Sequence, residues 1–153
     1  MSDRIRGALF NTLGDISGLT VLDAFAGSGA LSFEAVSRGA GCALAIEVDK
    51  SAQQTMAENI TGLGLEGEVR LVRAKAQSWL STTDEKFDIV ICDPPYDHVN
   101  HDLLARLADR AKPGGTVVFS LPPGASLSLD NGYELLQRKD YGDATLNFFR
   151  KTA

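Results

Sequence analysis

The stretch VLDAFAGSGALSFEA, residues 21–35, decides the fold of this chain. It begins as an apolar run typical of a buried strand and ends with apolar residues at helical spacing. Gly27 and Gly29 lie between the two halves, where the backbone has to turn sharply without a Cβ in the way. A strand that enters a helix through such a loop favours an α/β protein with a ligand at the helix N-terminus, although a purely structural tight turn would use the same glycines.

Strand-like and helix-like segments alternate along the rest of the chain. This order predicts an α/β fold with a mostly parallel sheet, helices on both faces and a ligand at the carboxyl ends of the strands. A leading helix over residues 3–13 and a closing hairpin of residues 133–139 and 144–151 are also expected. Between them we expect strands at residues 20–26, 42–48, 69–74, 87–93 and 116–121, and helices at 30–38, 50–63, 76–80 and 100–111.

Length, composition and charge narrow the class of protein. The chain has 153 residues, of which 44% are hydrophobic and 23% charged, so one globular domain over residues 1–153 is expected. No apolar run approaches the roughly 20 residues of a membrane-spanning helix, and charged residues follow Met1, which favours a cytoplasmic protein. Cys42 and Cys92 lie in apolar runs and predict buried reduced thiols. The net charge of −5 argues against a protein that binds nucleic acid over its whole surface.

Two acids close the first two predicted strands at the ligand edge. Asp23 would repel a pyrophosphate but attract an ammonium group, and Ser32 stands where an NAD-type loop carries a third glycine or alanine. Glu47 follows the glycines at the distance from which a carboxylate typically binds ribose hydroxyls. Together they predict a pocket for an amino-acid-bearing nucleoside. Asp49 is expected to cap the next helix.

The stretch VICDPPYDHV, residues 90–99, ends the fourth predicted strand with an acid, two prolines and an aromatic ring. Pro94 and Pro95 restrict the backbone that follows Asp93. The Asp93 carboxylate and the Pro94 carbonyl can accept N–H bonds from a planar amine, and the Tyr96 ring can stack on it. These residues therefore predict a device that positions an amine.

Three motifs, LDAFAGSGAL, IEVD and DPPY, resemble in this order those of the class I S-adenosylmethionine-dependent methyltransferases. DPPY resembles the subset that methylates exocyclic amino nitrogens. DRIRGALFNTL near the start and YGDATLNFFRK near the end are similar to the RsmD family of 16S rRNA guanine-N2 methyltransferases. The resemblance covers nearly the whole chain. It implies a Rossmann-like three-layer sandwich whose seven-stranded sheet has the order 3-2-1-4-5-7-6, with the seventh strand antiparallel.

The resemblance also implies S-adenosylmethionine as cofactor and ribosomal RNA or the small ribosomal subunit as partner, in a monomer without metal or membrane. Methyl transfer would be a direct displacement that depends mainly on positioning, with Asp93 orienting the amine. The resemblance assigns the target guanine to Asp93, Pro94, Pro95 and Tyr96. It assigns the cofactor to Asp23, Phe25, Ala26, Gly27, Ser28, Gly29, Glu47, Val48, Lys75, Ala76 and Asp93.

Two positions depart from the family pattern. Lys75 stands where the family usually has Asp or Asn to accept the adenine amino group, and a lysine has no acceptor, so the backbone of Ala76 is expected to serve instead. Arg4 and Arg6 are the only basic residues at the leading helix, where the family has more. This difference predicts weak binding of naked RNA.

Several alternatives stay open on the sequence alone. Enzymes that act on other amines share DPPY, so an adenine-N6 or protein-amide methyltransferase is one alternative, and a non-catalytic module of the same fold is another. NAD-dependent redox chemistry is disfavoured by Asp23 and Ser32. His98 and His101 lack an accompanying carboxylate pair and predict polar rim residues in preference to a metal site, while Trp79 predicts a packing residue.

Overall fold

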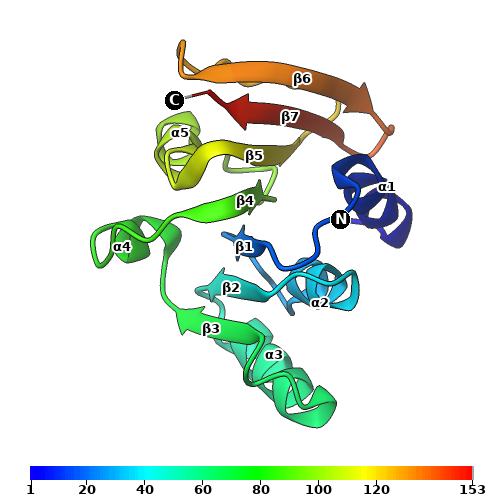
Figure 1. The fold of residues 1–153 in the computed structure, drawn as a ribbon, viewed down its shortest axis with the longest axis vertical. Coiled ribbons are helices and arrows are strands. Elements are labelled where there is room, and N and C mark those ends of the chain that lie inside the picture. The colour runs from blue at the N-terminus through cyan, green and yellow to red at the C-terminus, as the bar shows by residue number, and fades with distance from the viewer. Residues whose placement is uncertain (153) are drawn as a thin grey trace.

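Seven strands form one sheet in the computed structural model of the chain, which describes residues 1–152 (Figure 1). The order is β3-β2-β1-β4-β5-β7-β6, with β7 antiparallel to both of its neighbours and all other pairs parallel. This confirms the predicted topology. The strands are β1 (Thr20–Asp23), β2 (Cys42–Glu47), β3 (Val69–Arg73), β4 (Phe87–Cys92), β5 (Ala111–Leu121), β6 (Tyr133–Asp140) and β7 (Thr145–Lys151).

Five helices cover the sheet in two layers (Figure 1). On the α1 face, named after its first helix, Ile89 and Ile91 of β4 pack in the core beneath α1 and α2. On the opposite α5 face, Val90 and Cys92 pack with α4 and α5. No helix within residues 1–152 is long and apolar enough to cross a membrane. The helices are α1 (Asp3–Leu13), α2 (Ala30–Ser37), α3 (Lys50–Leu63), α4 (Ala76–Leu80) and α5 (His101–Ala108).

Side-chain caps begin three of the helices. The Ser2 hydroxyl accepts the Ile5 N–H at the start of α1, and the Asn100 amide oxygen accepts the Leu103 N–H at the start of α5. The Asp49 carboxylate accepts the Ala52 N–H at 2.9 Å, which confirms it as the N-cap of α3. Such caps satisfy N–H groups that have no partner within the helix.

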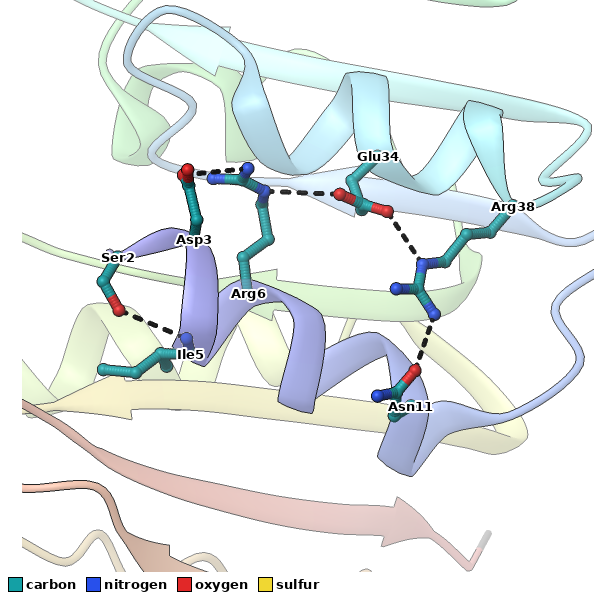
Figure 2. A network of polar contacts seen from close by, with 7 residues as sticks. All are labelled: Ser2, Asp3, Ile5, Arg6, Asn11, Glu34 and Arg38. Carbon is teal, nitrogen blue, oxygen red and sulfur yellow. Dashed lines mark hydrogen bonds and ion pairs between the residues drawn. The ribbon is translucent and has the colours of Figure 1, made fainter.

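A polar network fixes α1 beside α2 on the outside of the α1 face (Figure 2). The Arg6 guanidinium contacts Asp3 at 3.0 Å and Glu34 at 3.5 Å, and Arg38 contacts Glu34 at 2.8 Å. Arg38 also donates to the Asn11 side chain. Because Glu34 of α2 contacts both arginines, its carboxylate joins Arg6 of α1 to Arg38.

The predicted helix over residues 100–111 was too long. It ends at Ala108, and β5 begins at Ala111, five residues before the predicted start at Thr116. Residues 112–115 form a bulge, because Phe87 pairs with Ala111 whereas Ile89 pairs with Thr116. Pro and Gly in this segment read as a turn in the sequence, and only the pairing with β4 extends the strand across them.

The remaining boundaries and packing predictions differ little from the structure. β1 ends at Asp23 instead of Ala26, because the chain leaves the sheet to form the glycine-containing loop. Cys92 is fully buried, but Cys42 at the start of β2 is only half-buried, so the prediction of two buried thiols was wrong for Cys42. Trp79 is buried with its ring centroid 6.1 Å from that of Phe87, which confirms a packing role.

Residues 24–29, called the glycine loop below, connect β1 to α2. The Ala24 N–H donates to the Ile91 carbonyl and the Ala26 N–H to the Ile46 carbonyl, so both neighbouring strands hold the loop. Gly27 and Gly29 then turn the chain at φ values of 58° and 97°. Residues with a side chain rarely adopt these angles, which is why the turn needs glycine.

Alanine at Gly29 is expected to destabilise the protein more than alanine at Gly27. Both changes strain the backbone by roughly 1–2 kcal/mol. A Cβ at position 29 would in addition lie 2.9 Å from the Phe33 ring and 3.0 Å from Met56, whereas none lies within 4 Å of one at position 27. Urea unfolding of the two variants measures the difference, and equal losses of unfolding free energy would contradict the packing at Gly29.

Candidate active site

One cavity of about 800 Å³ lies at the carboxyl ends of β1, β2, β3 and β4. A volume of this size accommodates a ligand as large as a nucleoside with a side arm. The glycine loop forms part of its wall, and the turn of residues 93–96, called the acceptor turn below, forms another part. Of the predicted site residues, those that line it are Phe25, Gly27, Glu47, Val48, Lys75, Ala76, Asp93, Pro94, Pro95 and Tyr96.

Glu47 ties the glycine loop to the end of β2. Its Oε1 accepts the Gly27 N–H at 2.6 Å, and its Oε2 accepts the N–H groups of Asp49 at 2.8 Å and Val48 at 3.1 Å. The carboxylate is thereby fixed at the cavity wall. Oε2 thus accepts two N–H groups and Oε1 only one, so Oε1 can still accept a hydroxyl from a ligand.

Asp23 does not lie at the mouth of the loop, where the sequence placed it. Its exposed fraction is 0%, and the cavity lining does not include it. Ser32 of α2 donates its hydroxyl to Asp23 Oδ2 at 2.7 Å, while Oδ1 has no partner within residues 1–152. Burial raises the pKa of Asp23 to about 7, the Ser32 hydrogen bond opposes the rise, and the charges of Asp93 and Glu47 add to it.

Ala26, Ser28 and Gly29 also lie outside the cavity lining. Gly29 packs against Phe33 and Met56, and Ala26 packs in the core beneath α3. Their assignment to the cofactor stays a prediction. These residues shape the loop that presents Gly27 and Phe25 to the cavity.

The acceptor turn presents Asp93 and Tyr96 to the cavity. Pro94 is buried and Pro95 exposed, so the turn is anchored at its first proline. Burial raises the pKa of Asp93 above its ordinary value. The Met1 ammonium, 3.8 Å from Asp93 Oδ2, and the hydroxyls of Ser120 and Tyr96 oppose that rise. These three groups favour the ionised form of Asp93, whereas its burial disfavours that form.

Lys75 lies at the start of α4 beside the cavity. It occupies the N-cap position but makes no side-chain cap bond, and Ala76 and Gln77 line the cavity next to it. Lys75, the residue that departs from the family pattern, therefore lines the cavity in which the sequence predicts the cofactor to bind.

Several lining residues escaped prediction from the sequence. Gln77, Asn100, Leu103 and Leu104 belong to α4 and the start of α5, and their apolar members have the spacing of ordinary core positions. Ser120, whose hydroxyl bonds with that of Tyr96, lies 24 residues away in the sequence. No local pattern marks such a contact.

The cysteines and histidines are the remaining candidates for reactive or metal-binding groups near the cavity. Burial raises the pKa of the Cys92 thiol far above its ordinary value, and the charges of Asp23 and Asp93 add to the effect, so no thiolate forms near neutral pH. His98 lines the cavity and is exposed, while His101 lies outside the lining. Residues 1–152 contain no group of three His, Cys, Asp or Glu placed to hold a metal ion.

Two relatives of the chain among known proteins carry the same name. Ribosomal RNA small subunit methyltransferase D of Escherichia coli strain K12 is 42% identical over 96 residues, which cover 62% of this chain and 48% of that protein. The protein of the same name from Haemophilus influenzae is 28% identical over 156 residues, covering 97% of this chain and 80% of its own length. The chain thus spans about half the length of the Escherichia coli relative.

A solved structure described as putative methyltransferase yhhF from Escherichia coli matches the fold with a TM-score of 0.89 and 29% identity, covering 99% of this chain and 86% of that one. This likeness confirms the class I methyltransferase fold. The family model described as conserved hypothetical protein 95 matches residues 1–150. The chain therefore belongs to the conserved hypothetical protein 95 family, which confirms the predicted resemblance to the RsmD methyltransferases.

Proposed function

We propose that this chain transfers a methyl group from S-adenosylmethionine to an exocyclic amine of a nucleic-acid base, guanine N2 of 16S rRNA. One observation carries the proposal: the glycine loop with Glu47 and the acceptor turn with Asp93 line a single cavity. A donor and an acceptor bound there would meet inside one enclosure. Two separate cavities would have favoured a binding module over an enzyme.

The names of the relatives support the choice of acceptor. The Escherichia coli and Haemophilus influenzae proteins are described as methyltransferases of small-subunit ribosomal RNA. By this likeness we propose ribosomal RNA or the small ribosomal subunit as the partner of the chain. We also propose that the protein is a cytoplasmic monomer with one domain over residues 1–153.

The residues present fit S-adenosylmethionine. Gly27 leaves the cavity wall bare, Glu47 offers a carboxylate to ribose hydroxyls, and Asp23 behind the loop has an unpartnered oxygen that favours a nearby cation. The Ala76 backbone lies beside the cavity for the adenine, because Lys75 cannot accept its amino group. When bound, the cofactor supplies a methyl group already activated by a sulfonium.

At the other end of the cavity, the acceptor turn would hold the amine. The Asp93 carboxylate and the Pro94 carbonyl accept its two N–H bonds, and the Tyr96 ring stacks on the base. This arrangement directs the nitrogen lone pair toward the donor and restricts rotation of the amine. Positioning of this kind supplies most of the acceleration in a direct displacement.

Calorimetric titration with S-adenosylmethionine, with NAD in parallel, tests the donor. Radiolabel transfer to 16S rRNA, small ribosomal subunits, and guanine-rich or adenine-rich oligonucleotides then tests the acceptor. We expect the chain to bind S-adenosylmethionine and not NAD. We expect it to transfer the methyl group to guanine, and faster to small ribosomal subunits than to naked RNA. Transfer to adenine would overturn the guanine assignment, and absence of binding would favour a non-catalytic module.

Replacing Asp93 by alanine is expected to lower the transfer rate at least about 100-fold, because the amine loses its charged acceptor. The Kd for S-adenosylmethionine should change little. Asp97→Ala is the matched control, since Asp97 is an exposed acid one residue beyond the acceptor turn and outside the cavity lining. Equal loss of transfer and of cofactor binding in Asp93→Ala would contradict a separate acceptor role.

Binding of S-adenosylmethionine is expected to release protons at pH 6 and to tighten as the pH rises through about 7. The Asp23 pKa is about 7 in the free protein, and a cation bound nearby lowers it, so the carboxyl ionises on binding. Above the pKa of the free protein the carboxyl is already ionised before the ligand binds. Asp23 then releases no proton on binding, and the affinity no longer rises with pH on its account.

Titrations at pH 6 and pH 8 in buffers of different ionisation enthalpy measure the released protons. Asp23→Asn is the control, because it keeps the shape of the side chain and removes the ionisation while the amino group of the ligand titrates as before. Identical proton release by the variant and the natural chain would contradict a contribution from Asp23.

A further inference from the structure

Ser120 is a buried polar residue that contacts Tyr96 of the acceptor turn and lies outside the cavity lining. It is the second-last residue of β5, and its exposed fraction is 0%. Cys92 of β4 pairs with Phe119 of β5 in the parallel sheet. Asp93 comes directly after Cys92, and Ser120 directly after Phe119. The fold therefore brings Ser120 to the level of Asp93, although no motif connects the two residues.

Ser120 also points to the same side of the sheet as the acceptor turn. Ile91 and Val118 belong to the core of the α1 face. Because side chains alternate along a strand, Asp93 and Ser120, two residues further on, face that side too. Tyr96 packs against the same core. Asp93, Tyr96 and Ser120 therefore converge on one side of the sheet edge.

The hydroxyls of Ser120 and Tyr96 form a short hydrogen bond in which either can donate. Tyr96 is half-buried, and burial raises its pKa, so its phenol stays protonated near neutral pH. The phenol is thus fastened to β5. With its hydroxyl held by Ser120, the Tyr96 side chain is fixed in the wall of the cavity and can present its ring to a ligand there.

We propose that Ser120 is a positioning residue, which holds the Tyr96 ring at the angle at which its face stacks on the acceptor base. This inference rests on the proposed function and adds the part that orients the acceptor. The Tyr96 hydroxyl then makes no contact with the acceptor, and its role is internal to the protein. Ser120 acts through Tyr96 and, because its hydroxyl also favours the ionised form of Asp93, through Asp93 as well; it does not touch the reacting atoms.

A double-mutant cycle between Ser120→Ala and Tyr96→Phe tests this role, with transfer to small ribosomal subunits as the assay. Each change removes the hydrogen bond between the two hydroxyls and also that hydroxyl's stabilisation of Asp93, so each should lower kcat/KM for the acceptor at least about 5-fold, the effect of one neutral hydrogen bond. The double variant should lose less than the product of the two single losses, because the shared hydrogen bond is lost only once. Ser120→Thr, which keeps the hydroxyl, should restore most of the activity, and the Kd for S-adenosylmethionine should stay unchanged in all variants.

Three results would overturn the proposal. The first is a Ser120→Ala variant with full activity, and the second is a double variant whose loss is the product of the single losses. The third is a Tyr96→Phe loss much larger than that of Ser120→Ala, because it would mean that the phenol contacts the acceptor directly. If Ser120→Ala does not fold, the hydrogen bond can still be removed by Tyr96→Phe, because Tyr96 is only half-buried. The kcat/KM of Tyr96→Phe is then compared with that of Ser120→Thr.

NMR of protein with labelled tyrosine separates this inference from the proposed function. The chain has three tyrosines, Tyr96, Tyr133 and Tyr141, so Tyr96→Phe identifies the Tyr96 signal. Ser120→Ala should shift that signal and leave those of Tyr133 and Tyr141 in place. An unshifted Tyr96 signal would refute the contact even in an active enzyme. A shifted signal in a chain that transfers no methyl group to any acceptor would refute only the proposed function.

Discussion

Three adjacent parallel strands, β2, β1 and β4, each carry a carboxylate to the same edge of the sheet, and the site depends on how the protein accommodates these charges. Glu47 is stabilised by three backbone N–H groups. Asp93 has the Met1 ammonium and neighbouring hydroxyls, whereas Asp23 has Ser32 at one oxygen and no partner for its Oδ1 within residues 1–152. The charge that remains uncompensated favours a ligand that carries a cation.

The sequence predicted the parts of the fold that depend on local patterns. Alternating segments identified the strands and helices, and the motifs ending β1, β2 and β4 identified the acids of the site. The bulge in β5 was missed because Gly115 looks like a turn until β4 pairs beside it. Asp23 was misplaced because the depth of a side chain depends on the packing of α2, which the sequence does not display.

The glycine loop and the acceptor turn achieve rigidity by different means. In the loop, glycines with positive φ angles form the turn, and N–H groups of the loop donate hydrogen bonds to both neighbouring strands and to Glu47. In the turn, proline rings restrict the backbone and the Tyr96 hydroxyl is anchored on β5. The two walls of the cavity therefore keep their separation without a direct bond between them, which leaves the space between them to ligands.

The two prolines of the acceptor turn have a consequence for which bases can enter. Neither Pro94 nor Pro95 has a backbone N–H, and the Tyr96 hydroxyl is engaged by Ser120. The two prolines consequently add carbonyl acceptors to the turn and no N–H donor. A base edge that carries an oxo group would leave two acceptors facing each other, whereas an amino group satisfies both. In the proposed reaction, this hydrogen-bond polarity would distinguish guanine, which carries an amino group at C2, from xanthine, which carries an oxo group there.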